Sequence, residues 1–333
     1  MDVLVIGAGV IGLTAAIRLR ERGADVTVWA AAEGEQTVSA VAAAVWYPTR
    51  TDADPRVLRW ATETYAEFVR QIDAGVPGML ARPTRNLHRT PLPALPWWAA
   101  AAAPVTLRDG TPPYVQEVCF VAPLADMRIY LDWLRRRFLA SGGRIERRTV
   151  HSLHDLPAPV VVNATGLAAG VLAADPAVRP ARGHVVLVDN PGLSTSVRDE
   201  EGVTYVHPRT DDVVLGGTFD LDRADTGPDP AEAAAIVERC VKLVPELAGA
   251  RIRGAKIGLR PVRLGGPRVA VETVAGGRRI VHAYGHGGAG MTLSWGCAAE
   301  VTALALDPVS HGPDDGCGPA PLGGTRITWT MPG

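Results

Sequence analysis

The chain has 333 residues, a formal net charge of -1 and a hydrophobic fraction of 47%, an ordinary composition for a globular protein. It lacks the excess of Lys and Arg that a nucleic-acid partner selects, and no run of about 18 apolar residues predicts a membrane span. Its four cysteines stand far apart without a CxxC pair, so neither a metal site nor a disulfide framework is predicted. Because a strand is predicted to begin at residue 2, we expect no signal peptide and a cytoplasmic location.

The N-terminal 30 residues predict a strand, a glycine loop, a helix and a second strand. Gly7, Gly9 and Gly12 form a GxGxxG motif in the loop. In this motif the first glycine permits a tight turn, the second lets the backbone approach a pyrophosphate, and the third lets the helix pack on the strand. The motif alone does not choose between FAD and NAD. The predicted elements are a strand at residues 3–6, a helix at residues 10–21 and a strand at residues 25–30.

The end of the second strand departs from the usual dinucleotide site. An acidic residue is expected roughly 20 residues after the glycines, where it binds the ribose. Here Trp29 is followed by three alanines, and only Glu33 or Glu35 beyond them could serve. The ribose contact therefore stays open.

The rest of the chain predicts an α/β fold in which a Rossmann-like FAD-binding domain is interleaved with an antiparallel-sheet α+β substrate domain. Prolines and tryptophans interrupt regular parallel sheet in residues 46–123. Helices are predicted at residues 128–140, 231–244 and 291–306, parallel strands at 160–163 and 279–284, and an antiparallel sheet from segments 183–189, 204–217 and 268–274. We expect the FAD-binding domain to comprise residues 1–45, 128–180 and 275–306, the substrate domain 46–127 and 181–274, and a Gly/Pro-rich tail 307–333.

Two later segments carry further chemistry. A second glycine loop, residues 284–292, places backbone amides and a helix N-terminus where they could face negative charge, although such loops also serve tight packing. Arg260 follows an apolar strand-like stretch and precedes Pro261. Its guanidinium could bind a carboxylate with two hydrogen bonds, the alternative being a surface charge.

Together these segments resemble the D-amino acid oxidase family. Residues 258–263 followed by 284–296 match that family's carboxylate-binding and flavin-binding signature in order and near spacing, and residues 41–48, 162–166 and 182–184 extend the likeness. The resemblance implies FAD as cofactor and a small D-amino acid and O2 as partners. Arg260 and Tyr205 would bind the substrate carboxylate, the Gly288 carbonyl would receive the amine, and Thr292 would bond the flavin O2 edge.

The resemblance also implies the residues that surround FAD. The expected cofactor-binding residues are Gly7, Ala8, Gly9, Val10, Ile11, Gly12, Thr37, Ser39, Ala43, Ala44, Val45, Gly166, Leu167, Arg260, His286, Gly287, Gly288, Gly290, Met291 and Thr292. The expected reaction is oxidative deamination, with hydride passing to flavin N5 and with 2-oxo acid, ammonia and hydrogen peroxide as products. Neutral D-amino acids are the expected substrates. The sequence leaves the oligomeric state open, a homodimer being among the options.

Other functions compete with this interpretation. A glycine or sarcosine-type oxidase, a D-aspartate oxidase, an NAD-dependent dehydrogenase and a flavin-binding protein without turnover all fit parts of the sequence. Glu201 stands where some family members carry a second tyrosine, and the loop at residues 197–203 is short for a lid, so we expect open access.

His207 lies two residues after Tyr205 on a predicted strand, so both should face the pocket. At an ordinary pKa of about 6.5 its imidazole would be neutral near pH 8 and cationic at lower pH. We therefore expect activity on acidic substrates to rise relative to activity on neutral ones as pH falls. The alternative is a histidine that is hydrogen-bonded within the sheet and does not contact the substrate.

Overall fold

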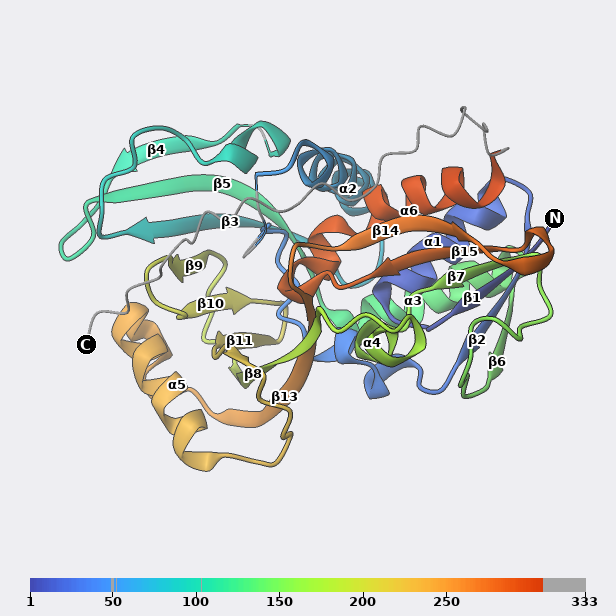
Figure 1. The fold of residues 1–333 in the computed structure, drawn as a ribbon. Helices are drawn as coiled ribbons and strands as arrows, with labels where there is room; N and C mark the ends of the chain where they lie inside the picture. The colour runs from blue at the N-terminus through green and yellow to red at the C-terminus, as the bar shows by residue number, and fades with distance from the viewer. Residues whose placement is uncertain (49–50, 52, 103, 308–333) are drawn as a thin grey trace, which may run out of the picture.

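The computed structural model describes residues 1–48, 51, 53–102 and 104–307. Two sheets organise these residues, and the chain passes between them several times (Figure 1). The first sheet has the order β14-β15-β7-β1-β2-β6, made of β1 (Asp2–Ile6), β2 (Asp25–Ala30), β6 (Arg144–Arg147), β7 (Val160–Asn163), β14 (Arg268–Thr273) and β15 (Arg279–Tyr284).

The first sheet is parallel except at one edge. β1 pairs in parallel with β2 and β7, and β15 and β6 extend the sheet in the same direction. The short strand β7 is buried along its whole length, as its run of valines predicts. The parallel strand ends therefore meet at one edge, where a ligand can be held by the loops that follow.

The edge strand β14 corrects one expectation. Residues 268–274 were expected in the antiparallel sheet of the substrate domain, but β14 pairs antiparallel with β15 in the first sheet. Alternating residues predict a strand without identifying its partner, and only a short turn separates β14 from β15. By sheet membership, the substrate domain's last strand ends at Arg263.

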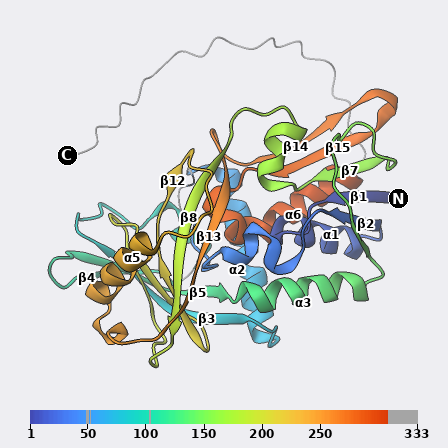
Figure 2. The same cartoon turned by 90° about the horizontal axis from the view of Figure 1, so that it is seen from below.

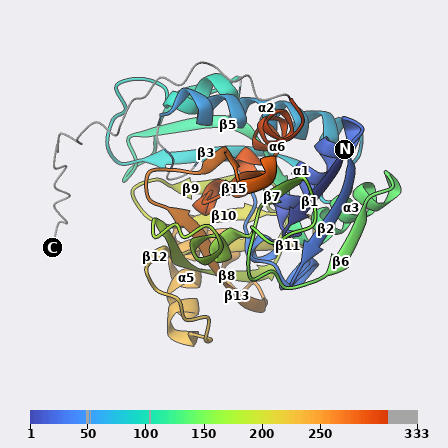
Figure 3. The ribbon, with the colours of Figure 1, turned by 45° about the vertical axis from the view of Figure 1, so that its right-hand side comes forward.

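Helices cover the first sheet. Helix α1 (Val10–Glu21) and α3 (Met127–Ala140) follow their predicted bounds to within one residue, and α6 (Gly290–Leu306) begins one residue earlier than predicted. Figure 3 shows α6 nearly end-on beside α2 (Pro55–Asp73). Helix α6 contacts both α2 and α1. Helix α2 was not predicted and lies in the stretch expected to belong to the substrate domain. A side chain at Gly296 would overlap the α2 backbone at Trp60, so the two helices pack at close range.

The segment at residues 287–306, which contains α6, is long and apolar enough to cross a membrane, but 67% of its most apolar stretch is buried. Helix α6 contributes Leu293, Trp295 and Val301 to the hydrophobic core. A core helix explains its composition.

The second sheet is mainly antiparallel. Its strands are β3 (Met79–His88), β4 (Thr106–Asp109), β5 (Gln116–Ala125), β8 (Val178–Asp189), β9 (Ser196–Asp199), β10 (Tyr205–Pro208), β11 (Asp212–Gly216), β12 (Asp220–Leu221) and β13 (Ile252–Arg263). They follow the order β12-β8-β11-β10-β9-β3-β5-β4, with β13 pairing β8. The short helix α4 (Ala169–Leu172) precedes β8, and 3-10 turns lie at Gly34–Gln36, Val38–Val41, Trp97–Ala101, Gly166–Ala168, Pro245–Leu247, Ala275–Gly277 and Gly287–Ala289.

Alternation along β8, β10 and β11 gives this sheet two different faces. Helix α5 (Pro230–Leu243) covers one face of the sheet (Figure 2). On that face Ile236 and Cys240 belong to one hydrophobic cluster with Val206 and Leu215. Neighbouring residues of the same strands point the other way, toward the first domain, and Tyr205 is among them. Strand periodicity therefore decides which side chains face the first sheet.

Candidate active site

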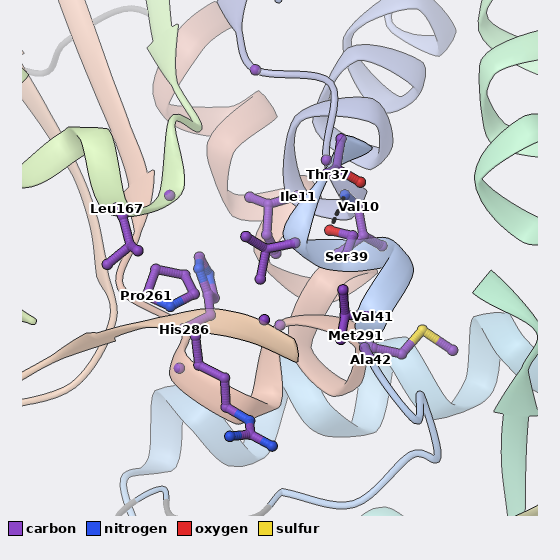
Figure 4. A pocket seen from close by; sticks show the side chains of 18 of the residues that line it. Val10, Ile11, Thr37, Ser39, Val41, Ala42, Leu167, Pro261, His286 and Met291 are labelled. Atoms are coloured by element: carbon purple, nitrogen blue, oxygen red, sulfur yellow. Dashed lines mark hydrogen bonds between the residues drawn. The ribbon is translucent and has the colours of Figure 1, made fainter. Parts of the chain in front are cut away.

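A cavity of about 530 Å³ runs between the two sheets. It begins beside Trp29 at the end of β2, passes the first glycine loop and ends at the strands of the second sheet. Figure 4 shows side chains from the first glycine loop, the second glycine loop and β13 facing this space. Its length and its walls suit a dinucleotide with a small substrate at one end.

The first glycine loop has the close packing that its motif predicts. Gly7 has a φ of +112°, and a side chain there would overlap the Ala164 carbonyl. A side chain at Gly12 would overlap the Gly7 carbonyl, so helix α1 can approach the strand only without one. Gly12 itself does not line the cavity, which agrees with a packing role.

The N-terminus of α1 faces the cavity beside two hydroxyl-bearing residues. The Val10 amide donates a hydrogen bond to Ser39 Oγ at 3.1 Å, which Figure 4 shows. Thr37 Oγ1 donates to the Gly34 carbonyl at 2.7 Å. The first turn of α1 has no acidic residue, so its free amides and the helix dipole present positive potential to an anion.

At the β2 end, residues other than a carboxylate line the cavity. Glu33 and Glu35 are not among its lining residues, and Glu33 instead pairs with Arg135 at 3.2 Å. Gln36 and Arg148 line this end, and the Arg148 guanidinium lies 4.3 Å from the centre of the Trp29 ring. Neither residue was predicted from the sequence, because neither belongs to a motif. Arg148 in addition follows β6, which is distant from β2 in the sequence.

The second glycine loop lies against the same cavity. His286 is 5% exposed, and its Nε2 has no hydrogen-bond partner among the residues that the structure describes. Burial lowers the pKa of His286 to about 4, so its imidazole is neutral near pH 7. Gly287, Gly288, Gly290 and Met291 also line the cavity at the start of α6.

Thr292 lies differently from its expected position. Its hydroxyl donates to the Tyr47 carbonyl and accepts from the Tyr47 amide, both at 3.0 Å. Thr292 does not line the cavity. Both hydroxyl bonds hold the segment before α2 against α6.

Arg260 reaches the cavity from β13 across a glycine. Its Nη1 donates to the Thr218 carbonyl at 3.0 Å, and its guanidinium lies 5.6 Å from the centre of the Phe219 ring. A side chain at Gly183 would overlap the guanidinium. The remaining donors of Arg260 are thus available to a carboxylate.

Tyr205 occupies the middle of the same face. Its ring lies over Gly216, the residue that pairs with it on β11, where any side chain would overlap the ring. Burial raises the pKa of Tyr205 above its ordinary value, while the nearby charges of Arg260 and Arg198 oppose that shift. Its hydroxyl therefore stays protonated at neutral pH and can donate a hydrogen bond.

Arg198 is a cavity residue that the sequence analysis missed. It pairs with Tyr205 across β9 and β10, so both side chains project to the same face. Its guanidinium lies 4.9 Å from the centre of the Tyr47 ring and 5.8 Å from that of Tyr205. Only the strand register brings Arg198 here, and a lone arginine in a sequence gives no such signal.

His207 faces the cavity as predicted, but its expected titration is wrong. Its ring stacks on Tyr205 at a centroid distance of 4.7 Å. Burial, together with the positive charge of Arg198, lowers the pKa of His207 to about 3. The imidazole is therefore neutral throughout the neutral and alkaline range and offers no cation to an acidic substrate.

The turn between β9 and β10 is short and anchored. Glu201 accepts hydrogen bonds from the Arg89 and Thr90 amides at 2.9 and 3.0 Å, away from the cavity that it does not line. Arg89 Nη1 also donates to Asp199 at 2.8 Å. The turn at residues 200–204 is thus fastened to the loop after β3, and Val203 from it lines the cavity.

Most of the expected cofactor-binding residues line the cavity. Within the described residues no cluster of His, Cys, Asp and Glu could hold a metal ion, and Cys119, Cys240 and Cys297 are unpaired. Cys317 and the tail beyond residue 307 lie outside the described part of the chain. The expected residues that line the cavity are Gly7, Ala8, Gly9, Val10, Ile11, Thr37, Ser39, Ala43, Ala44, Val45, Gly166, Leu167, Tyr205, Arg260, His286, Gly287, Gly288, Gly290 and Met291.

Comparisons with known proteins agree with this geometry. The family model described as FAD dependent oxidoreductase matches residues 2–304. A D-amino-acid oxidase from Rubrobacter xylanophilus is 46% identical over 91% of this chain and 95% of its own length, and one from Streptomyces coelicolor is 43% identical over 91% and 96%. The crystal structure of glycine oxidase from Geobacillus kaustophilus has the same fold, with a TM-score of 0.79, 19% identity and coverage of 91% of this chain and 94% of that one.

Proposed function

Because the chain belongs to the family of FAD dependent oxidoreductases, we propose that it oxidises D-amino acids to 2-oxo acids, ammonia and hydrogen peroxide. The observation that carries the proposal is the placement of Arg260 and Tyr205 together at one end of a dinucleotide-sized cavity. Similarity to D-amino-acid oxidases over nearly the whole chain supports it.

The cavity fits FAD through its own residues. Gly7 and Gly9 of the first loop line the cavity, and the N-terminus of α1 at Val10 borders it, so backbone can approach a pyrophosphate there. Gly287 to Met291 and the orphaned Nε2 of His286 border the part of the cavity between this loop and Arg260. Bound FAD would supply the acceptor for two electrons, which no side chain of this site can provide.

Arg260 and Tyr205 orient the substrate. The guanidinium offers a planar pair of donors to the carboxylate, and the protonated Tyr205 hydroxyl offers another. Gly288 lines the same cavity, and its carbonyl is the acceptor that we assign to the substrate amine. With carboxylate and amine fixed, only one enantiomer can direct its α-hydrogen to the reacting face.

No general base is assigned to this reaction. His207 and His286 have depressed pKa values and are buried, and neither has a hydrogen-bonded carboxylate that would poise it for proton transfer. The residues therefore act by orientation and by a fixed electrostatic environment. Overall, one amino acid, one O2 and one water yield 2-oxo acid, ammonia and hydrogen peroxide.

A substrate screen tests the proposal. Peroxide release is measured with the D- and L-forms of leucine, glutamine and methionine and with glycine and sarcosine. We expect release with the neutral D-amino acids and none with their L-forms. A preference for glycine or sarcosine would instead indicate the reaction of glycine oxidase, an enzyme whose fold this chain shares. A protein purified without a yellow flavin and active with NAD would overturn the proposal.

A further inference from the structure

Two arginines flank Tyr205 in the cavity wall. Arg260 comes from β13 and Arg198 from β9, and the sheet order β13-β8-β11-β10-β9 places Tyr205 of β10 between them. Both arginines line the same cavity. A substrate whose carboxylate is held by Arg260 and Tyr205 therefore has a second guanidinium beyond the tyrosine, where it could meet a substrate side chain.

A carboxylate of the protein already occupies Arg198. Glu200 forms an ion pair with Arg198, with 2.8 Å between Nε and Oε1, and the two side chains are only 15% and 16% exposed. Glu200 does not line the cavity, so it approaches the guanidinium from outside that space. Such a largely buried pair cancels much of the field that Arg198 would otherwise exert on a ligand.

Tyr47 holds Glu200 in this position. The Tyr47 hydroxyl donates to Glu200 Oε2 at 2.9 Å. Burial and the negative charge of Glu200 raise the pKa of Tyr47 above its ordinary value, so the phenol remains a donor. The Tyr47 ring in turn packs edge-on against Trp98 at a centroid distance of 5.3 Å. The hydrogen bond from Tyr47 thus fixes Oε2, while Oε1 lies at ion-pair distance from Arg198 Nε without a hydrogen-bonding geometry, so the carboxylate is held beside Arg198.

We propose that Glu200 makes this site select D-amino acids with uncharged side chains, because it neutralises Arg198, which would otherwise attract an acidic side chain. This inference rests on the proposed D-amino-acid oxidase function. An acidic side chain must compete with Glu200 for Arg198, whereas a cationic one meets Arg198 itself. A neutral side chain can lie against the Tyr47 and Tyr205 rings without disturbing the pair.

The test compares D-glutamate with D-glutamine, which have the same shape and differ in charge. We expect wild-type kcat/KM to favour D-glutamine, and Glu200→Gln to raise the D-glutamate to D-glutamine ratio by about tenfold or more. Adding Arg198→Gln should bring the ratio back down. Glu201→Gln is the matched control, since Glu201 is the next residue but points away from the cavity, and its ratio should equal that of wild type.

Ligand binding gives a second readout that needs no turnover. Glutarate and its monoamide are titrated into the FAD-loaded proteins, and the flavin absorbance reports Kd. We expect Glu200→Gln to tighten glutarate binding relative to the monoamide. If Glu200→Gln does not retain FAD, the Arg198→Gln variant tests the proposal instead. Glu200 then has no arginine to neutralise it, so the D-glutamate to D-glutamine ratio should fall below that of wild type.

The failures are distinguishable. A wild-type enzyme that oxidises no D-amino acid would refute the proposed function itself. If the enzyme oxidises D-glutamine but Glu200→Gln has the wild-type ratio, the function stands and the role of Glu200 is overturned. The same holds for a wild-type ratio in Arg198→Gln when that variant replaces Glu200→Gln in the test. A wild-type preference for D-glutamate would overturn it as well.

Discussion

The guanidinium of Arg260 lies over Gly183 so closely that no side chain at position 183 could coexist with it. Gly183 pairs with Gly258 in the β8–β13 ladder, two residues before Arg260. The glycine therefore creates the space in which the arginine extends toward Tyr205. Gly183, which has no side chain, thus determines where the carboxylate-binding guanidinium of Arg260 can lie.

The first prediction uses this contact. Gly183→Ala should displace the end of the Arg260 side chain, because that flexible end can move more easily than the strands. KM for D-amino acids should rise by about tenfold or more, while FAD content and thermal stability change little. Gly227→Ala is the control, since nothing lies within 4 Å of a side chain added there. Unchanged KM in Gly183→Ala would contradict the placement of Arg260.

The second prediction concerns the two carboxylate-binding groups directly. Arg260→Ala should remove an interaction worth about 1.5 to 3 kcal/mol, which lowers kcat/KM by roughly 10- to 150-fold. Tyr205→Phe should cost less, about 0.5 to 1.5 kcal/mol, because it removes one neutral donor and leaves the arginine. Steady-state kinetics with D-leucine measures both. A larger loss in Tyr205→Phe than in Arg260→Ala would reverse our assignment.

The third prediction concerns cofactor retention. A Cβ atom added at Gly9 would lie 3.1 Å from Ser39 Oγ, so the branched side chain of Gly9→Val would crowd the loop that we expect to bind the pyrophosphate. The purified variant should carry little flavin, measured as the ratio of flavin to protein absorbance. Ser39→Ala removes only the bond to the Val10 amide and should retain most FAD. Full flavin loading in Gly9→Val would show that the loop does not hold the cofactor.

The fourth prediction follows from the buried imidazole of His207. Its folded-state pKa of about 3 lies below the ordinary 6.5, so the unfolded chain binds a proton first as pH falls. The stabilisation from neutral His207 is complete above about pH 6.5 and is lost toward pH 3, by up to about 1.4 kcal/mol per pH unit. Urea unfolding of wild type and His207→Leu between about pH 4 and pH 7 should show a shallower fall in the variant.

Exposed His151 provides the control for this titration, and His151→Gln should follow the wild-type curve. The same pKa predicts that the ratio of activity on D-glutamate to activity on D-methionine has no His207-dependent change between about pH 6 and pH 9. A ratio that changes in wild type but not in His207→Leu would restore the original expectation.

The sequence could predict the cofactor side of the site because its groups are adjacent in the chain. Gly7, Gly9 and Gly12 lie within one strand–loop–helix unit, where spacing alone determines their roles. Arg260 and Tyr205 were identified through family resemblance, since their proximity depends on β13 and β10 meeting through two intervening strands.

Other features depend on contacts that spacing does not encode. Arg198 enters the cavity through strand register, and the depressed pKa of His207 results from burial that only the packed sheet supplies. The partner of β14 and the packing of α2 on α6 likewise required the tertiary structure. The bonds of the Thr292 hydroxyl to the Tyr47 backbone likewise join segments that lie far apart in the sequence.

Anaerobic mixing of the FAD-loaded protein with D-leucine or L-leucine tests the central claim most directly. The flavin absorbance reports reduction without dependence on oxygen or peroxide. We predict rapid bleaching by D-leucine, slower bleaching at equal substrate concentration in Arg260→Ala, and none by L-leucine. Bleaching by both enantiomers at equal rates, or by neither D-leucine nor any other D-amino acid, would contradict the assignment of this cavity.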